Sequence, residues 1–159
     1  PYHRVLAADL ERSPASLKHE LVHPLLSAAG GFPLWLEEGL AELYADSSWR
    51  KRKLRFGRRH RLARLRAMLA ADRLPGPARL HRADDRVLYG PRGLDYTTTA
   101  RFLLLYQQEH NPQGLEGLVA QLRGGADLSQ ALEKYAKWDD FRSWCKKITH
   151  EGNSGLTAE

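Results

Sequence analysis

The sequence predicts one α+β domain that is mainly helical. Helix-start signals such as Ser-Pro and Asp alternate with Gly-Gly and Asn-Pro stops, and the segments between them carry leucines at helical spacing. Only two short stretches have the character of strands. A chain of 159 residues can bury a core without a disulfide or a metal, and its one cysteine, Cys145, excludes an intramolecular disulfide. Any bound metal is therefore expected to have a catalytic role and not a structural one.

The N-terminal half is expected to contain both strands and three helices. Ser13-Pro14 supplies a helix start, and Gly30-Gly31 supplies the following stop. The expected elements, in chain order, are a strand over Tyr2–Ala8, a helix over Pro14–Ala29, a helix from Pro33, a strand near Leu54–Phe56, and a helix with Leu62, Leu65 and Leu69 on one face. Residues 72–94 hold three prolines and three glycines, which predicts a long loop.

The C-terminal third predicts an array of helices. Its expected members are a helix capped by Asp95 and ending at His110, one that stops at Gly124-Gly125, one over Leu128–Ala136 capped by Asp127, and a last one opened by Asp139 or Asp140, with Phe141, Trp144, Cys145 and Ile148 as its buried face. We expect a single domain over residues 1–150 and a flexible tail over 151–159. The first residue is Pro1 rather than Met, which indicates a segment of a longer or processed chain.

The segment His19-Glu20-Leu21-Val22-His23 is the strongest indication of chemistry. Residues four apart face the same side of a helix, so His19 and His23 can bind one metal ion, with Glu20 one residue further round. Zinc lowers the pKa of a bound water to about 7, and a carboxylate beside that water can accept its proton. The spacing therefore predicts a hydrolytic metal site. Pro24 is expected to kink the helix directly after His23, and we expect the site to tolerate it.

A second helix supplies the acidic residues that such a site needs. A catalytic zinc uses three protein ligands and one open position. Glu38 follows the glycine turn that folds its helix back along the first, so it can be the third ligand. Glu42 lies one turn later, and it can accept a hydrogen bond from the outer nitrogen of a ligand histidine. The predicted cofactor is one Zn2+ bound by His19, His23 and Glu38.

The segment from His19 to Tyr44 resembles the gluzincin clan of zinc metallopeptidases, and its small peptidase MA-like members most of all. The resemblance implies a zincin-like domain with an active-site helix, a glutamate helix and a C-terminal helical array. It implies peptide-bond hydrolysis with Glu20 as the general base, and it implies that Glu42 orients His19. Such members are commonly bacterial and often exported or embedded in larger proteins, so the resemblance also implies an exported or membrane-associated peptidase acting on a peptide or protein.

The resemblance extends more loosely to a later tyrosine. Members often carry, past a variable loop, a helix that begins with tyrosine, and the segment Tyr96–Leu105 resembles it. The resemblance implies that Tyr96 donates a hydrogen bond to the oxyanion that develops in the transition state. Tyr89, on the loop just before this helix, is the alternative candidate for the same role.

A basic run suggests a different class of function. Residues 50–66 hold ten Lys or Arg, in a chain with 25 basic and 19 acidic residues. Such a run can contact a phosphate backbone or an anionic lipid surface, with Trp49 and Phe56 available for stacking or insertion. We expect it instead to be mainly a solvated helix face, and nucleic acid is not an expected partner, because no nucleic-acid-binding signature accompanies it.

The alternative function is a non-enzymatic zincin-like module that uses the run Arg50–Arg66 to contact anionic partners. Glu20 argues against this alternative, because a purely structural metal site has no use for a general base. The sequence contains no apolar run long enough to span a membrane, and it leaves the oligomeric state open.

Overall fold

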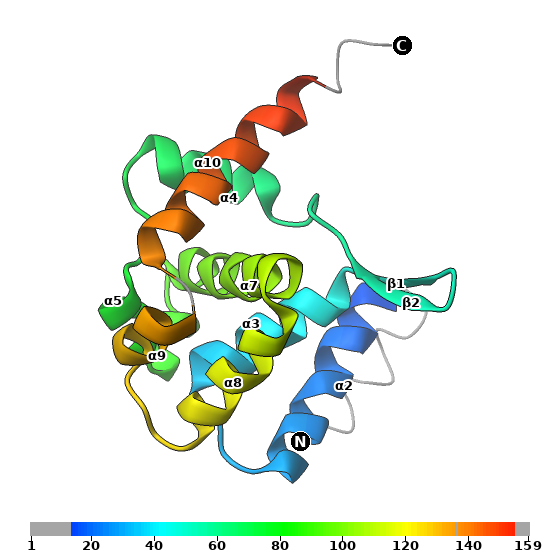
Figure 1. Cartoon of the computed structure of the whole chain (residues 1–159), viewed down its shortest axis with the longest axis vertical. Coiled ribbons are helices and arrows are strands. Elements are labelled where there is room, and N and C mark those ends of the chain that lie inside the picture. Colours follow the sequence, from blue (N-terminus) through cyan, green and yellow to red (C-terminus); the bar gives the residue numbers. More distant parts are fainter. Residues whose placement is uncertain (1–13, 136, 155–159) are drawn as a thin grey trace.

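The computed structural model describes residues 14–135 and 137–154, which are mainly helical (Figure 1). The elements are α2 (Pro14–Ala29), α3 (Leu34–Ala45), β1 (Ser47–Arg50), β2 (Lys53–Phe56), α4 (Leu62–Ala70), α5 (Pro77–His81), α6 (Asp85–Leu88), α7 (Gly93–His110), α8 (Pro112–Arg123), α9 (Leu128–Tyr135) and α10 (Trp138–Ser154). The α+β, mainly helical class is confirmed. The strand predicted over Tyr2–Ala8 lies outside the described residues.

Helix α7 lies at the centre of the molecule and is buried along most of its length (Figure 1). Its apolar run 102–105 is at most 1% exposed, and α3, α4, α8 and α10 all pack against it. Helix α3 contributes the fully buried Trp35 and Leu36 to the same core. Helix α2 packs on α3 and has no fully buried residue, so it is an outer helix. The order α2, α3, α7 therefore runs from the surface to the centre.

Gly39 sets the distance between α3 and α7. A Cβ atom at this position would lie 2.8 Å from the Cβ of Ala100 and 3.0 Å from Cδ1 of Leu104. Carbon atoms do not approach so closely without a backbone shift, so only glycine fits. The glycine that follows Glu38 in the sequence therefore has a packing role, because it lets α3 lie directly on α7.

The strands β1 and β2 form an antiparallel hairpin that projects from the helical body (Figure 1). Its register pairs Ser47 with Phe56 and Trp49 with Leu54, and the two-residue turn between the strands is Lys51-Arg52. The strand expected near Leu54–Phe56 is confirmed. The sequence analysis did not predict β1, because its four residues carry only one large apolar side chain and form a strand by pairing with β2.

The base of the hairpin is tied to the core by Arg101 of α7. This buried side chain donates 2.8 Å hydrogen bonds to the Asp46 carboxylate and to the carbonyl oxygen of Gly57, which flank the hairpin. Burial lowers the pKa of Arg101, and the Asp46 carboxylate opposes that shift. The rings of Tyr44 and Phe56 also meet edge to face, with centroids 5.4 Å apart. The hairpin therefore projects from a fixed base.

Two predictions for the middle of the chain are wrong. Residues 72–94 are not one long loop, because they contain the short helices α5 and α6; Asp84 caps α6 by accepting a 3.0 Å hydrogen bond from the Val87 amide. Asp95 is not a helix cap, because α7 begins two residues earlier. Its buried carboxylate instead lies 2.7 Å from a guanidinium nitrogen of Arg64 and 3.3 Å from one of Arg92. A tertiary ion pair has replaced the local cap.

The C-terminal helices follow the sequence prediction closely, except that α10 begins at Trp138, so Asp139 and Asp140 lie in its first turn and do not open it. Asn111 and Asp127 cap α8 and α9 by accepting 2.8 Å hydrogen bonds from backbone amides. The predicted buried face of the last helix is confirmed, since Phe141 and Cys145 are 0% exposed. Helix α10 continues to Ser154, beyond the expected domain boundary at residue 150, and residues 155–159 lie outside the described part. Among the described residues, no helix combines the length and apolar character that a membrane span requires.

The close α3–α7 contact predicts the effect of enlarging Gly39. Gly39→Val should lower the free energy of unfolding by about 1–3 kcal/mol, because the added methyl groups overpack the interface. Gly31→Ala is the matched control, since a Cβ there meets no atom within 4 Å, and it should stay within about 0.5 kcal/mol of the wild type. Urea denaturation measures both; an unchanged midpoint for Gly39→Val would contradict the packing role.

Candidate metal centre

Helix α2 brings the two histidines of the sequence motif to one side. The rings of His19 and His23 lie one turn apart with centroids 5.1 Å from each other and planes inclined by 63°. Helix α2 is continuous through Pro24, which lies inside it. The histidines therefore lie on neighbouring turns of one helix. Tolerance of the proline by a metal site stays a prediction.

A glycine turn folds α3 back against α2. Gly30 has a φ of +91°, a conformation that glycine adopts without a steric penalty, and its amide closes the end of α2 on the carbonyl of Ser27. Helix α3 then begins after Pro33 and packs along α2. Because Glu38 is in the second turn of α3, its side chain meets the histidines of α2. This one turn therefore brings Glu38 next to His19 and His23, although they are 15 or more residues apart in the sequence.

The three predicted ligands converge on a volume that suits a metal ion. Nε2 of His19 lies 3.6 Å from Oε2 of Glu38, and Nε2 of His23 lies 4.0 Å from Oε1. One donor atom from each residue lies within 4.8 Å of the others, so the group could hold a metal ion. Tetrahedral zinc with bonds of about 2.0–2.1 Å separates its ligands by about 3.3 Å. A small inward movement of the side chains would close the site around such an ion.

Electrostatics favours an ionised carboxylate at this site. Burial by itself raises the pKa of Glu38, but the neighbouring His19 and Tyr89 outweigh it and hold the pKa below its ordinary value. The same Glu38 carboxylate raises the pKa of His19 and outweighs the opposite effect of burial. A metal ion therefore meets a charged ligand at Glu38 and displaces a proton from His19 when that imidazole is protonated.

The two tyrosine candidates occupy different environments. The hydroxyl of Tyr89 donates a 2.8 Å hydrogen bond to Oε1 of Glu38, so Tyr89 reaches the candidate metal centre from the residue that follows α6. Its ring is 69% exposed. Tyr96 is half-buried in the first turns of α7 and packs against the hydrophobic core. The structure thus brings the alternative candidate, Tyr89, to the ligands, while it gives Tyr96 a packing role.

Glu20 lies on the exposed side of α2, between the two histidines in sequence. Its negative charge is the smallest of the contributions that raise the pKa of His19, after those of Glu38 and Glu42. The side chains of His19 and His23 are themselves 21% and 29% exposed. The candidate metal centre is therefore partly open to solvent.

Glu42 has partners that the sequence analysis missed. Its buried carboxylate accepts hydrogen bonds of 2.7 Å from Nε2 of His60 and of 2.8 and 3.2 Å from the guanidinium of Arg61. Among the described residues, these are the hydrogen bonds that its side chain makes, and none of them comes from His19. The expected orienting hydrogen bond to His19 is therefore not formed, although the charge of Glu42 contributes to the raised pKa of that histidine. Spacing could not reveal this pairing, because His60 and Arg61 come from a segment 18 residues away.

Comparisons of the chain with models of protein families, with curated proteins and with solved structures find no match. The gluzincin resemblance and the zincin-like fold stay predictions that rest on the motif residues.

Removal of one ligand tests the centre directly. His23→Ala should abolish stoichiometric binding of zinc, because two remaining donors leave a divalent ion without a closed site. His150→Ala is the control, since this exposed histidine on α10 has no place among the three donors. Elemental analysis of the purified proteins gives the metal content, and one equivalent of metal in His23→Ala would show that the assignment is wrong.

The Glu42 contacts predict a loss of stability that depends on pH. Burial raises the pKa of Glu42, but Arg61 and His60 outweigh it and hold the pKa below the ordinary value of 4.5. The stabilisation is therefore complete above about pH 4.5 and is lost as the pH falls through the lower folded-state pKa. Glu42→Gln should lower the free energy of unfolding by about 1–3 kcal/mol at neutral pH. Denaturation at several pH values should show this difference shrinking in acid; a pH-independent difference would contradict the ionic role.

Proposed function

We propose that this domain is a zinc-dependent metallopeptidase. The observation that carries the proposal is the convergence of His19, His23 and Glu38, from two antiparallel helices, on one partly exposed point. Two imidazoles and one carboxylate form a donor set that zinc accepts while it keeps a position open for chemistry. A closed structural site would use a fourth protein ligand, and no fourth His, Cys, Asp or Glu among the described residues joins the group.

Zinc bound at this centre would acidify a coordinated water and polarise the carbonyl of a peptide bond. The protein must then supply a base, an oxyanion donor and room for the substrate. Glu20 is the proposed general base, because it follows His19 directly on α2, is exposed to solvent and has a carboxylate that can accept a proton. The exposed position of the centre suits a peptide or an unstructured protein segment, which can be presented to it from solvent.

Tyr89 is the proposed donor to the developing oxyanion. Its hydroxyl donates a hydrogen bond to a carboxylate oxygen of Glu38, so a hydrogen-bond donor lies directly beside one of the proposed ligands. If Glu38 bound a metal ion through that oxygen, the Tyr89 hydroxyl would be free to donate to the substrate oxygen instead. A donor aimed at charge that develops only in the transition state raises kcat more than it changes substrate binding. This proposal replaces Tyr96, the first candidate from the sequence.

Removal of the proposed base gives the sharpest test of catalysis. Glu20→Gln keeps the size of the side chain but cannot accept the proton, so cleavage of an unstructured protein should fall by at least about 100-fold while zinc content is unchanged. Glu37→Gln is the matched control, because it makes the same change beside a ligand without entering the three-residue group. Wild-type cleavage by zinc-loaded Glu20→Gln would overturn the mechanism, and absence of cleavage by the zinc-loaded wild type would favour the non-enzymatic module.

The two tyrosines are distinguished by a paired substitution. Tyr89→Phe removes the hydroxyl that contacts Glu38 and should lower kcat by about 10- to 100-fold, with a smaller change in KM. Tyr96→Phe should leave kcat within about twofold of the wild type, because its ring packing is retained. Steady-state kinetics on one peptide substrate measures both, and the reverse order of effects would return the role to Tyr96.

A further inference from the structure

The β1–β2 hairpin has two chemically different faces. Opposite residues of an antiparallel pair share a face, so the register places Trp49 and Leu54 on one face, next to the Ser47–Phe56 pair. The other face carries Arg55 opposite Ser48, and Arg50 opposite Lys53. The hairpin is therefore apolar on one face and cationic on the other, with two further cations, Lys51 and Arg52, in its turn.

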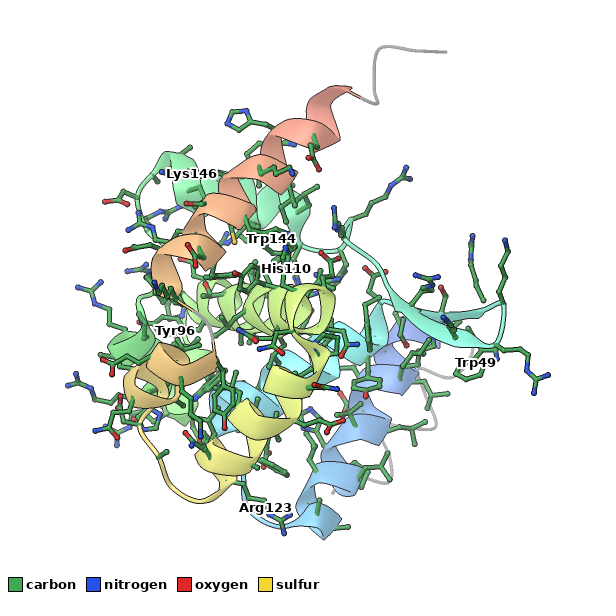
Figure 2. All side chains as sticks on the ribbon, viewed as in Figure 1. Trp49, Tyr96, His110, Arg123, Trp144 and Lys146 are labelled. Atoms are coloured by element: carbon green, nitrogen blue, oxygen red, sulfur yellow. The ribbon has the colours of Figure 1, made fainter. Side chains whose placement is uncertain are left out.

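Beyond the base of the hairpin, where Phe56 packs against the core, the hairpin side chains are turned to solvent. Trp49 is 71% exposed and Leu54 is 38% exposed, and Figure 2 shows Trp49 on the projecting hairpin, away from the helical body. Of the four tryptophans, Trp35 and Trp144 are buried and Trp138 is half-buried, so only Trp49 is mainly exposed to solvent. An exposed Trp-Leu pair loses the free energy of apolar burial unless something covers it. A covering partner would need an apolar region that also tolerates cations.

Nine of the ten basic residues of the run fall into two groups with different roles; the tenth, Arg59, is exposed and forms no ion pair with the described residues. Arg58, Arg61 and Arg64 form ion pairs with Glu109, Glu42 and Asp95, and Arg66 donates to the carbonyl oxygen of Thr149. These residues hold the fold together. The hairpin cations, by contrast, are all exposed, and no ion pair involves them in the part of the chain that the structure describes: they are Arg50, Lys51, Arg52, Lys53 and Arg55. Their charge is therefore available to an anionic partner.

The turn residues point to a role beyond stability. Lys51 and Arg52 have φ values of +49° and +60°, as in a type I′ turn, for which Asn-Gly is the favoured pair. A lysine and an arginine in this conformation destabilise the hairpin relative to Asn-Gly. Strained backbone conformations concentrate at functional sites. The two cations at the tip of the hairpin therefore lower the stability of the turn, which indicates a role other than stabilising it.

We propose that the β1–β2 hairpin docks the protein on an anionic phospholipid bilayer. Tryptophan prefers the interface between hydrocarbon and headgroups, so Trp49 and Leu54 would insert there at the side of the tip. Lysine and arginine beside them would reach the phosphates and the anionic headgroups, each strengthening the attraction roughly fivefold. The base fixed by Arg101 lets the hairpin enter the headgroup region as a rigid body.

The separation of the two faces favours a bilayer over a nucleic acid. A strand that stacked a base on Trp49 would need phosphate-binding cations on the same face. That face instead carries Leu54 beside Trp49, while Arg50, Lys53 and Arg55 lie on the other one. A bilayer surface surrounds an inserted hairpin tip and so contacts both faces at once. The proposal does not depend on the metal centre or on the proposed peptidase activity.

Vesicle binding tests the proposal on the whole chain. The protein should sediment with phosphatidylcholine vesicles that contain about one-third phosphatidylserine and much less with phosphatidylcholine alone, at roughly 0.1 M salt. Tryptophan emission should shift to shorter wavelength on binding, because Trp49 leaves water. Trp49→Thr keeps a strand-forming residue, and it should lose this shift and bind about tenfold more weakly. No sedimentation of the wild type with the anionic vesicles would overturn the proposal.

The turn allows a variant whose weaker binding cannot come from an unfolded hairpin. Lys51→Asn with Arg52→Gly removes two cations and installs the favoured turn pair, so the fold should be kept while affinity for anionic vesicles falls by about 25-fold. Lys146→Gln with Lys147→Gln is the matched control, because it removes two exposed cations from α10 and should leave binding unchanged. Wild-type binding by the turn variant, or tighter binding of the wild type to single-stranded RNA than to vesicles, would overturn the proposal.

Discussion

The contact between α3 and α7 is the constraint on which the rest of the structure depends. Gly39 removes the side chain that would separate the two helices, so α3 lies directly on Ala100 and Leu104 of the central helix. Helix α3 is thereby fixed with one side in the core and the other toward α2. Glu38 precedes this glycine, and its carboxylate is held where two imidazoles of α2 can meet it. The position of the candidate metal centre is thus set by the packing of apolar residues behind it.

Buried charges form a second set of constraints, and each is compensated by a partner distant in sequence. Asp95 is held by Arg64, Glu42 by Arg61 and His60, and Arg101 by Asp46. Leaving any of these charges unpaired in the interior is far more unfavourable than forming the pair is favourable. They therefore specify how α4 and the hairpin attach to the helical core. Two arginines of the basic run, Arg61 and Arg64, are used in this way, and the hairpin cations form a separate chemical surface.

The hairpin and the helix of the paired histidines are physically connected. Lys18, one residue before His19, donates a 2.7 Å hydrogen bond to the carbonyl oxygen of Ser47, where β1 begins. The hairpin base is fixed on its other side by the hydrogen bonds that Arg101 makes. A partner that engages the hairpin therefore contacts a part of the molecule joined to the first turns of α2. The hairpin and the helix of the candidate ligands are therefore neighbouring parts of the fold.

The sequence by itself determined the features that depend on local physics. Helical spacing of leucines, glycine stops and the turn at Gly30-Gly31 predicted α2 and α3, and the four-residue spacing of His19 and His23 predicted one ligand face. Asn111 and Asp127 were also predictable as helix boundaries, because capping uses amides of the same segment.

Only the tertiary structure decided which polar groups meet across the fold. Asp95 resembled a cap in sequence but pairs with Arg64, Glu42 takes His60 and Arg61 instead of His19, and Tyr89 rather than Tyr96 reaches Glu38. Likewise, β1 exists because β2 offers it a partner. Such choices depend on the free energy of burying a charge or an unpaired backbone group next to residues that are distant in sequence. Periodicity and spacing describe only residues close together in the sequence, so they cannot predict these distant contacts.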